Sequence, residues 1–269
     1  MPPSSPGDER TSRPPLLEIV IPARNEEGRL PGGLLQLCAK LARMPFPSRV
    51  IVVDNNSTDG TAEIVRTWPA GRVPVRLVAC ATPGKGAAVR AGLLATSAPF
   101  VGFCDADMAT DLDAVDSALG LLLSGERVVI GSRAHAGSVV ENRHSKVREL
   151  GAFGFRALAA ALVPGVSDTQ CGFKFFDGVL ARDVAAGLRT PGFAFDVELL
   201  ARCAARGAKV LEIPVNWHDM PGSRFSPARH SLGILLEMGR IWLRLRLRSR
   251  PCAAVGPAWE PPLDPVGYP

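Results

Sequence analysis

The stretch from Pro99 to Thr110 most constrains the fold, because a short apolar run ends there in two carboxylates. The run 100–104 (FVGFC) is too short for a typical helix and follows a proline, so it predicts a buried strand. A strand buried on both faces is typical of a parallel sheet covered by helices. Ligands of such sheets bind beyond the carboxyl ends of the strands, where Asp105 and Asp107 stand.

Asp105 and Asp107 are separated by one residue, and alternate positions on an extended backbone point the same way. Hard carboxylate oxygens suit Mg²⁺ or Mn²⁺, which often bridge to substrate phosphates. The alternative is a surface turn with two solvated acids, and a D-x-D pattern alone is a weak signal. The position directly after a buried strand favours the metal site.

Length and composition indicate one α/β domain with appendages, since 269 residues with a 46% hydrophobic share can build a substantial core. The net charge of +5 favours anionic partners such as nucleotides, phosphates or acidic lipid, and no nucleic-acid partner is expected. The six cysteines have no C-x-x-C spacing, which predicts reduced core residues of a cytoplasmic protein. Neither a secretory signal nor a run of about 18 apolar residues is present.

Strands and helices alternate along the chain through polar turns, which is typical of a parallel α/β sheet. Strands are expected at 16–21, 49–53, 75–79, 100–104, 127–133 and 209–217. Helices are expected near 25–43, 59–68, 112–124, 149–162, 179–188, 195–206 and 226–248. The predicted organisation is a disordered leader (1–15), a globular domain (16–225), a basic amphipathic helix (226–250) and a disordered tail (251–269).

A further helix is expected to begin at Lys85, which Gly84 and Gly86 flank. A glycine-rich helix start is a natural anion site, because its backbone N–H groups and dipole face the anion. The spacing is not that of a Walker loop. The alternative for Lys85 is a solvated lysine at a helix start.

Five motifs occur in one order: VIPARNEE, VVDNNSTDGT, GKGAAVRAG, DADMAT and GSR. Together they resemble glycosyltransferase family 2, inverting sugar-nucleotide enzymes with the GT-A fold. The later stretches DTQCGFKFF, FAFDVELL and EIPVNWHDMPGSRF are similar to those of dolichyl-phosphate β-glucosyltransferases and, more distantly, polyprenyl-phosphate mannosyltransferases. The resemblance covers residues 16 to about 240 and implies an α/β, Rossmann-like, mostly parallel sheet flanked by helices, with 16–225 as the GT-A catalytic domain.

The resemblance implies that a hexose moves from a nucleoside-diphosphate sugar, with UDP-glucose expected before GDP-mannose. Asp105 and Asp107 match the motif that holds Mg²⁺ or Mn²⁺, although Ala109 stands where mannosyltransferases can place a glutamine ligand. For Glu26 the alternative is an acid in the first turn of a helix. The implied donor-binding residues are Pro22, Arg24, Glu26, Asp54, Lys85, Asp105, Ser223 and Arg224.

On the acceptor side, Arg133 matches a family arginine proposed to hold the acceptor phosphate, with Arg148, or else Arg143, as its partner. Exposed basic residues are the alternative for these two partners. Asp168 matches the candidate catalytic base, and its alternative is a helix N-cap. A phosphate acceptor has a second pKa of about 6 and is already anionic. With such an acceptor Asp168 would orient groups, whereas a hydroxyl acceptor would need the base.

The implied acceptor is a polyprenyl or dolichyl phosphate, and two alternatives stay open. One is a transferase with a soluble small-molecule acceptor, and the other is a non-catalytic GT-A protein that binds nucleotide. The basic helix 226–250, which carries leucines, Trp242 and several arginines, is expected to bring the chain to an anionic membrane surface, peripherally on the inner face. Its alternative is a helix packed on its own domain.

Overall fold

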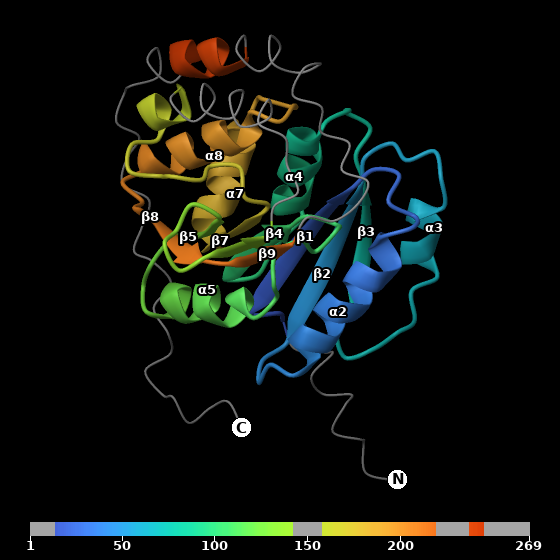
Figure 1. Cartoon of the computed structure of the whole chain (residues 1–269). Coiled ribbons are helices and arrows are strands. Elements are labelled where there is room, and N and C mark those ends of the chain that lie inside the picture. The colour runs from blue at the N-terminus through green and yellow to red at the C-terminus, as the bar shows by residue number, and fades with distance from the viewer. Residues whose placement is uncertain (1–13, 142–157, 219–236, 245–269) are drawn as a thin grey trace.

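The computed structural model describes residues 14–141, 158–218 and 237–244, in which a seven-stranded sheet lies between two layers of helices (Figure 1). The strand order is β3-β2-β1-β4-β7-β5-β8. The strands are β1 (Leu17–Ala23), β2 (Ser48–Asp54), β3 (Val75–Ala79), β4 (Phe100–Cys104), β5 (Val128–Ser132), β7 (Phe173–Asp177) and β8 (Val210–Pro214). The predicted α/β fold with a mostly parallel sheet is therefore confirmed.

The central strands are apolar on both faces, because helices cover both. In β1, Val20 packs in the core on one side of the sheet, whereas Ile19 and Ile21 pack on the other. In β2, Ile51 and Val53 share the side of Val20. This alternation explains why each strand appears in the sequence as a continuous apolar run.

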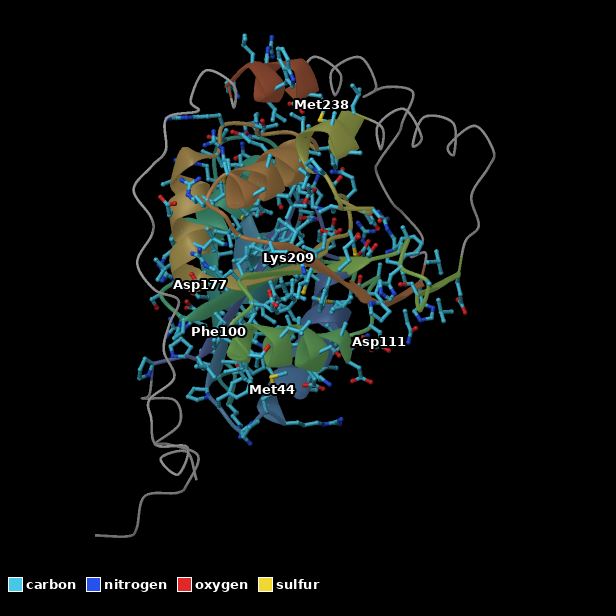
Figure 2. The ribbon with its side chains drawn as sticks, turned by 90° about the vertical axis from the view of Figure 1, so that its left-hand side faces the viewer. Met44, Phe100, Asp111, Asp177, Lys209 and Met238 are labelled. Carbon is cyan, nitrogen blue, oxygen red and sulfur yellow. The ribbon has the colours of Figure 1, made fainter. Side chains whose placement is uncertain are left out.

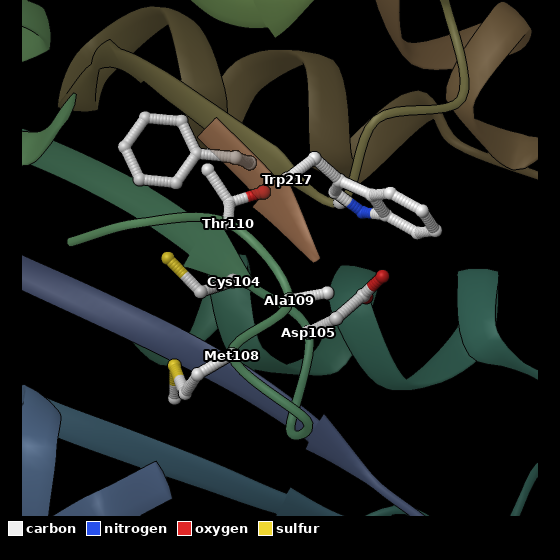
Figure 3. A pocket seen from close by; sticks show the side chains of 8 residues that line it. Cys104, Asp105, Met108, Ala109, Thr110 and Trp217 are labelled. Atoms are coloured by element: carbon white, nitrogen blue, oxygen red, sulfur yellow. The ribbon is translucent and has the colours of Figure 1, made fainter. Parts of the chain in front are cut away.

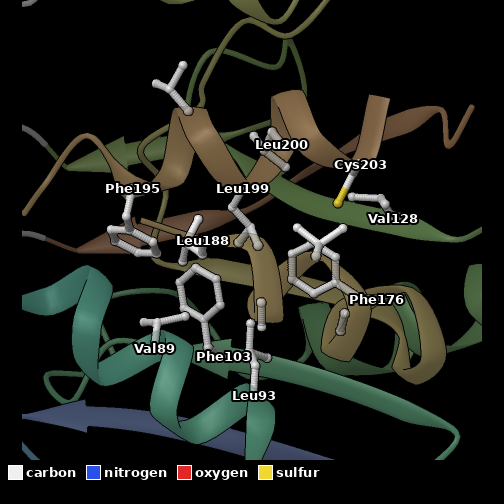
Figure 4. Close-up of a cluster of buried hydrophobic side chains, with 14 of the residues drawn as sticks. Val89, Leu93, Phe103, Val128, Phe176, Leu188, Phe195, Leu199, Leu200 and Cys203 are labelled. Atoms are coloured by element: carbon white, nitrogen blue, oxygen red, sulfur yellow. The ribbon is translucent and has the colours of Figure 1, made fainter. Parts of the chain in front are cut away.

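Helices α4 (Lys85–Leu94), α7 (Gly178–Gly187) and α8 (Phe195–Ala204) cover one face of the sheet (Figure 1). Helices α2 (Leu30–Ala42), α3 (Thr61–Arg66) and α5 (Ala114–Leu123) cover the other. Figure 4 shows side chains of the first layer meeting above β4, with Phe103 among Val89, Phe195 and Leu199. The strands β1, β2 and β4 end in loops, and ligands of such sheets bind at this edge.

Strand β7 was not predicted and interrupts the parallel order, since it runs antiparallel between β4 and β5. Its sequence FKFFD carries a lysine inside an aromatic run and gives no clean strand alternation. In the register, Gly102 of β4 lies opposite Phe175, and a Cβ at Gly102 would lie 2.7 Å from the Phe175 ring. The glycine in FVGFC therefore makes room for β7.

Two of the predicted elements differ clearly from the structure. Helix α2 begins at Leu30 instead of near 25, because Asn25 has φ 54° and starts a turn. The strand expected at 209–217 is two strands, β8 and β9 (Asn216–His218), and β9 pairs with the unpredicted β6 (Val139–Glu141). Of the helix expected at 149–162, the described residues 158–162 are helical.

Residues 237–244 form the described part of the predicted 226–250 helix. Met238 and Ile241 are buried in the core cluster beneath it, whereas Trp242 and Leu243 are 44% and 52% exposed. Figure 2 shows Met238 on the side of this helix that faces the rest of the domain. Over the described residues, no helix is both long and apolar enough to cross a bilayer.

A buried ion pair on α8 fixes the segment before that helix. The Glu198 carboxylate accepts the N–H groups of Arg189 and Thr190, and it receives two hydrogen bonds of 2.7 and 2.8 Å from the Arg202 guanidinium. Burial alone raises the pKa of Glu198, but the bonds from Thr190 and Arg202 and the Arg202 charge outweigh it, so the pKa lies below its usual value.

The Glu198 pair should make stability fall in acid. A carboxyl whose pKa is lower in the folded state stabilises the fold above its unfolded pKa of about 4.3, and that contribution is lost as the pH falls through the folded pKa. We expect Glu198→Gln to lower the free energy of unfolding by about 3–5 kcal/mol at pH 7 in urea titrations, because it leaves the Arg202 charge without its partner.

The difference between Glu198→Gln and the wild type should shrink towards pH 3. The matched control is Glu63→Gln, whose exposed pair with Arg66 should contribute under about 1 kcal/mol. An unchanged difference across this pH range would contradict the assigned role of the Glu198 charge.

Candidate active site

The two predicted metal carboxylates lie at the carboxyl end of β4. The Asp105 N–H donates to the Gly172 carbonyl at 3.0 Å, and an Asp105 oxygen lies 2.6 Å from the Lys85 ammonium. A small pocket beside Asp105 is lined by Cys104, Asp105, Met108, Ala109, Thr110, Gly172, Phe173 and Trp217 (Figure 3). The Asp105 carboxylate and the Trp217 indole point to the same side of the loop.

The charges of this loop influence one another. Burial and then the charge of Asp105 raise the pKa of Asp107 above its usual value. Burial lowers the pKa of Lys85, but the charges of Asp105 and Asp196 outweigh it, so this pKa lies above its usual value. Lys85 is therefore a charged partner of Asp105 and not the solvated helix-start lysine of the alternative interpretation.

The residues present fit a divalent ion that takes part of its ligands from a substrate. The carboxylates of Asp105 and Asp107 repel each other, so a nearby positive charge is favourable. The Lys85 ammonium supplies one such charge beside Asp105. Within the ranges that the structure describes, no cluster of three His, Cys, Asp or Glu side chains forms a complete metal cage. Mg²⁺ in particular is usually bound by one or two carboxylates, with phosphates and waters supplying the rest.

Gly172 shapes the other wall of the carboxylate site. A Cβ at this position would lie 2.0 Å from an Asp105 carboxylate oxygen, which is closer than real Cβ contacts. Only glycine therefore allows Asp105 to hold its present place. This contact could not be predicted from the sequence, because residues 105 and 172 flank the paired ends of β4 and β7, which are far apart in the chain.

The loops after β1 and β2 are joined by reciprocal hydrogen bonds. The Asn25 N–H donates to Ser57 Oγ at 2.9 Å, and the Thr58 N–H donates to Asn25 Oδ1 at 2.7 Å. The Glu26 N–H donates to Thr61 Oγ1 at 2.8 Å. These bonds bring the ends of β1 and β2 together as one wall of the predicted donor site.

The predicted donor residues at these strand ends lie on that wall. Arg24 is exposed, and the Glu26 carboxylate is bound by the Arg29 guanidinium through bonds of 2.7 and 2.8 Å. Glu26 precedes α2, so it is not a first-turn helix acid. Pro22 and Asp54 are half-buried at the ends of β1 and β2, whose register places residue 54 opposite residue 23.

Asn55 attaches the lysine loop to β2. Its amide donates to the Cys80 and Thr82 carbonyls, and its oxygen accepts the Gly84 N–H at 2.8 Å. The N–H groups of Gly86 and Ala87 both point to the Pro191 carbonyl, at 2.8 and 3.3 Å. Both of these helix-start N–H groups are therefore bonded within the protein. The positive charge of this loop lies on the Lys85 side chain, which contacts the Asp105 carboxylate.

Arg133 and Asp168 form one tight unit at the end of β5. The Arg133 side chain donates to both Asp168 oxygens, at 2.7 and 2.9 Å, and its backbone N–H donates to the same carboxylate. Burial raises the pKa of Asp168, but the Arg133 bonds and charge outweigh it, so the pKa lies below its usual value. An Asx turn to Gln170 takes the place of the alternative helix N-cap.

Trp217, which was not predicted to be a site residue, connects this unit to the carboxylate loop. The Arg133 guanidinium lies 5.6 Å from the centre of the Trp217 ring. The backbone of β9 also binds the loop, because the His218 N–H donates to the Ala109 carbonyl at 2.9 Å and Thr110 bridges to Trp217. An indole stacked on a guanidinium orients its charge.

The structure thus brings most of the predicted site residues to one edge of the sheet, but not all can be placed. Arg143, Arg148, Ser223 and Arg224 lie outside the described residues. The residues that the sequence analysis did not identify as part of this site are Arg29, Asn55, Gly172, Lys174, Asp196 and Trp217. A lysine within an aromatic run, as in FKFF, was a signal that could have identified Lys174.

Comparison with known proteins identifies the relatives of this chain. The family model described as "Glycosyl transferase family 2" matches residues 18–182. A human dolichyl-phosphate beta-glucosyltransferase is 34% identical over 86% of this chain and 75% of its own length. A Drosophila melanogaster protein of the same name is 35% identical over 85% of this chain and 74% of its own. A Dictyostelium discoideum protein of that name is 30% identical over 86% and 75%.

Solved structures with a similar backbone support the assigned fold. Glucosyl-3-phosphoglycerate synthase from Mycobacterium tuberculosis, solved with Mn²⁺, uridine diphosphate and phosphoglyceric acid, matches with a TM-score of 0.61 and 22% identity. That match covers 95% of this chain and 87% of the other. With a family match over residues 18–182 and relatives at 30–35% identity, this chain belongs to glycosyltransferase family 2 and is an enzyme of that class.

Proposed function

We propose that this glycosyltransferase moves glucose from UDP-glucose to a polyprenyl phosphate of the dolichyl type, with inversion at the anomeric carbon. The observation that carries the proposal is the arrangement at one sheet edge, where the Asp105–Lys85 pair and the Arg133–Asp168 unit both lie beside Trp217. Asp105 and Trp217 line the same pocket, and the Arg133 guanidinium lies 5.6 Å from the centre of the Trp217 ring. The names of the relatives, dolichyl-phosphate beta-glucosyltransferases, support the sugar and the acceptor.

The donor side is suited to a nucleoside diphosphate. Asp105 and Asp107 would hold Mg²⁺ or Mn²⁺, and the bound ion would supply Lewis-acid stabilisation of the leaving diphosphate. Lys85 adds a second positive charge beside the same oxygens. Pro22, Arg24, Glu26 and Asp54 would form the wall for the nucleoside, and Ser223 and Arg224 would close on the diphosphate.

The acceptor side is suited to a phosphate. Arg133 presents a guanidinium that matches phosphate geometry, and we assign Arg148 as its partner. The acceptor oxygen attacks the anomeric carbon while the bond to the diphosphate breaks on the opposite face. Asp168 already accepts four hydrogen bonds, three of them from Arg133. It would therefore orient the guanidinium, and an anionic phosphate needs no base.

The test is transfer of labelled glucose from UDP-glucose to dolichyl phosphate in detergent with Mn²⁺, with GDP-mannose as the competing donor. We expect a lipid-linked product from UDP-glucose. Product formed only with water-soluble acceptors would show that the acceptor is a soluble molecule and not a lipid phosphate. Transfer from GDP-mannose alone would overturn the choice of sugar.

Asp107→Ala should abolish metal-dependent turnover and leave the fold intact, because Asp107 lies in a loop beyond β4. The measurements are turnover with and without a chelator and the thermal unfolding midpoint. The matched control is Asp116→Ala, which removes an exposed carboxylate of α5 bound to Lys40. Full activity of the wild type in chelator would show that no metal is needed.

Asp168→Asn should raise the KM for the acceptor and leave kcat within about tenfold, because the variant loosens Arg133 without removing a base. Arg133→Lys, which keeps the charge and loses the two-point contact, should act in the same direction. A loss of about 10² to 10⁴ in kcat at saturating lipid phosphate is the usual worth of a general base. That result would return Asp168 to the role of base.

We also propose that the helix at 226–250 brings the enzyme to an anionic membrane surface, where a polyprenyl phosphate presents its headgroup. Trp242 and Leu243 are exposed beside Arg240, and each arginine near such a surface adds about 1 kcal/mol. Met238 and Ile241, by contrast, are buried in the domain. The helix would therefore bind the membrane with one face and its own core with the other.

The membrane proposal is tested by co-sedimentation with anionic and neutral liposomes. Truncation before Ile241 would remove a core residue, so the informative variant is Trp242→Ala with Leu243→Ala. We expect this variant to pellet less with anionic liposomes than the wild type. The control is Leu35→Ala, an exposed leucine of α2. Equal pelleting of all three proteins, or none, would remove the membrane role.

A further inference from the structure

Lys174 is a fully buried lysine in the middle of β7, and the mechanism above does not use it. Its side chain has 0% exposure. The ammonium donates to the Cys171 carbonyl at 2.6 Å and to an Asp196 carboxylate oxygen at 2.6 Å. It also lies 5.1 Å from the centre of the Phe103 ring. A charge in such a place is tolerated only because it is paired and hydrogen-bonded.

The Cys171 carbonyl links Lys174 to the metal carboxylates. The next residue, Gly172, accepts the Asp105 N–H and leaves no space for a Cβ beside the Asp105 carboxylate. The turn at 171–172 is therefore the surface on which Asp105 rests. Fixing one carbonyl of this turn fixes the position of the carboxylate.

Asp196 links Lys174 to the start of α4. It lies in the first turn of α8, and the segment just before that helix touches α4 closely. The Pro191 carbonyl accepts the N–H groups of Gly86 and Ala87, and a Cβ at Gly86 would lie 2.5 Å from Phe195 Cβ. The start of α8 thus sets the start of α4, where Lys85 stands. The charge of Asp196 also favours the charged form of Lys85.

Stability alone does not account for this pair. Replacing a buried ion pair by apolar side chains of similar volume is often neutral or stabilising, because both charges lose their water on burial. The apolar neighbour of the Lys174 ammonium is the Phe103 ring, whereas Phe173 and Phe175 pack on the opposite face of the sheet. A methionine would satisfy packing there, whereas only an ammonium can hold a carbonyl and a carboxylate together.

We propose that Lys174 is a positioning residue of the donor site: through the Cys171 carbonyl it holds the turn under Asp105, and through Asp196 it holds the helix start that carries Lys85. This inference rests on the proposed function, since it assigns the diphosphate and its metal ion to these two groups. Lys174 touches neither the substrate nor the ion. It acts on both ends of the Asp105–Lys85 pair at once.

The experiment measures binding of UDP in the presence of Mn²⁺ by calorimetry, together with the thermal unfolding midpoint. Lys174→Met should weaken binding by about 10- to 100-fold, the usual effect of losing a group that supports metal ligands. Because this variant leaves Asp196 buried without its partner, a second variant is needed. Lys174→Met with Asp196→Asn removes both charges and should restore the unfolding midpoint without restoring the affinity.

The matched control is Glu18→Gln. Glu18 is a buried carboxylate of β1 that binds Arg49 and the N–H groups of Ser97 and Ala98, away from the strand ends that form the site. The Glu18→Gln variant should be less stable than the wild type and should keep its affinity for UDP and Mn²⁺. Equal affinity of the wild type and the double variant would overturn the role of Lys174. If the wild type itself does not bind UDP with Mn²⁺, the proposed donor is wrong instead.

Discussion

The antiparallel pairing of β7 with β4 is the interaction on which the site depends. It places Phe173 opposite Cys104, so that the turn before β7 arrives beside the first metal carboxylate. The same pairing buries Lys174 beneath the starts of α4 and α8 and seats Phe175 on Gly102. Without this strand, β4 would end in two repelling acids with nothing to fix their direction.

The sequence predicted the parts of the fold that local pattern determines. Six parallel strands, their helices and the carboxylates after β4 follow from apolar runs that end in polar turns. The strand β7 did not follow, because its partners are distant in the chain and its lysine breaks the pattern. Helix α2 was predicted to start too early, because Asn25 adopts a left-handed turn that its side-chain bond to Thr58 stabilises.

The sequence allowed prediction of those site residues whose side-chain charge by itself indicates a role. Asp105, Asp107 and Lys85 were recognised by charge and position, and the structure brings Asp105 and Lys85 into contact. The role of Asp168 was open, because its pairing with Arg133 across 35 positions cannot be inferred from spacing. Gly172 was not identified, since a missing side chain has no chemistry to recognise until its neighbour is known.

The hydrogen bonds between the loops after β1 and β2 have an evolutionary consequence. Asn25, Glu26 and Glu27 each donate a backbone N–H to a side chain of the other loop. Inserting or deleting a residue in either loop would put all three bonds out of register together. These two loops should therefore keep a constant length among relatives, and variation in length should accumulate at connections that lack such bonds between loops.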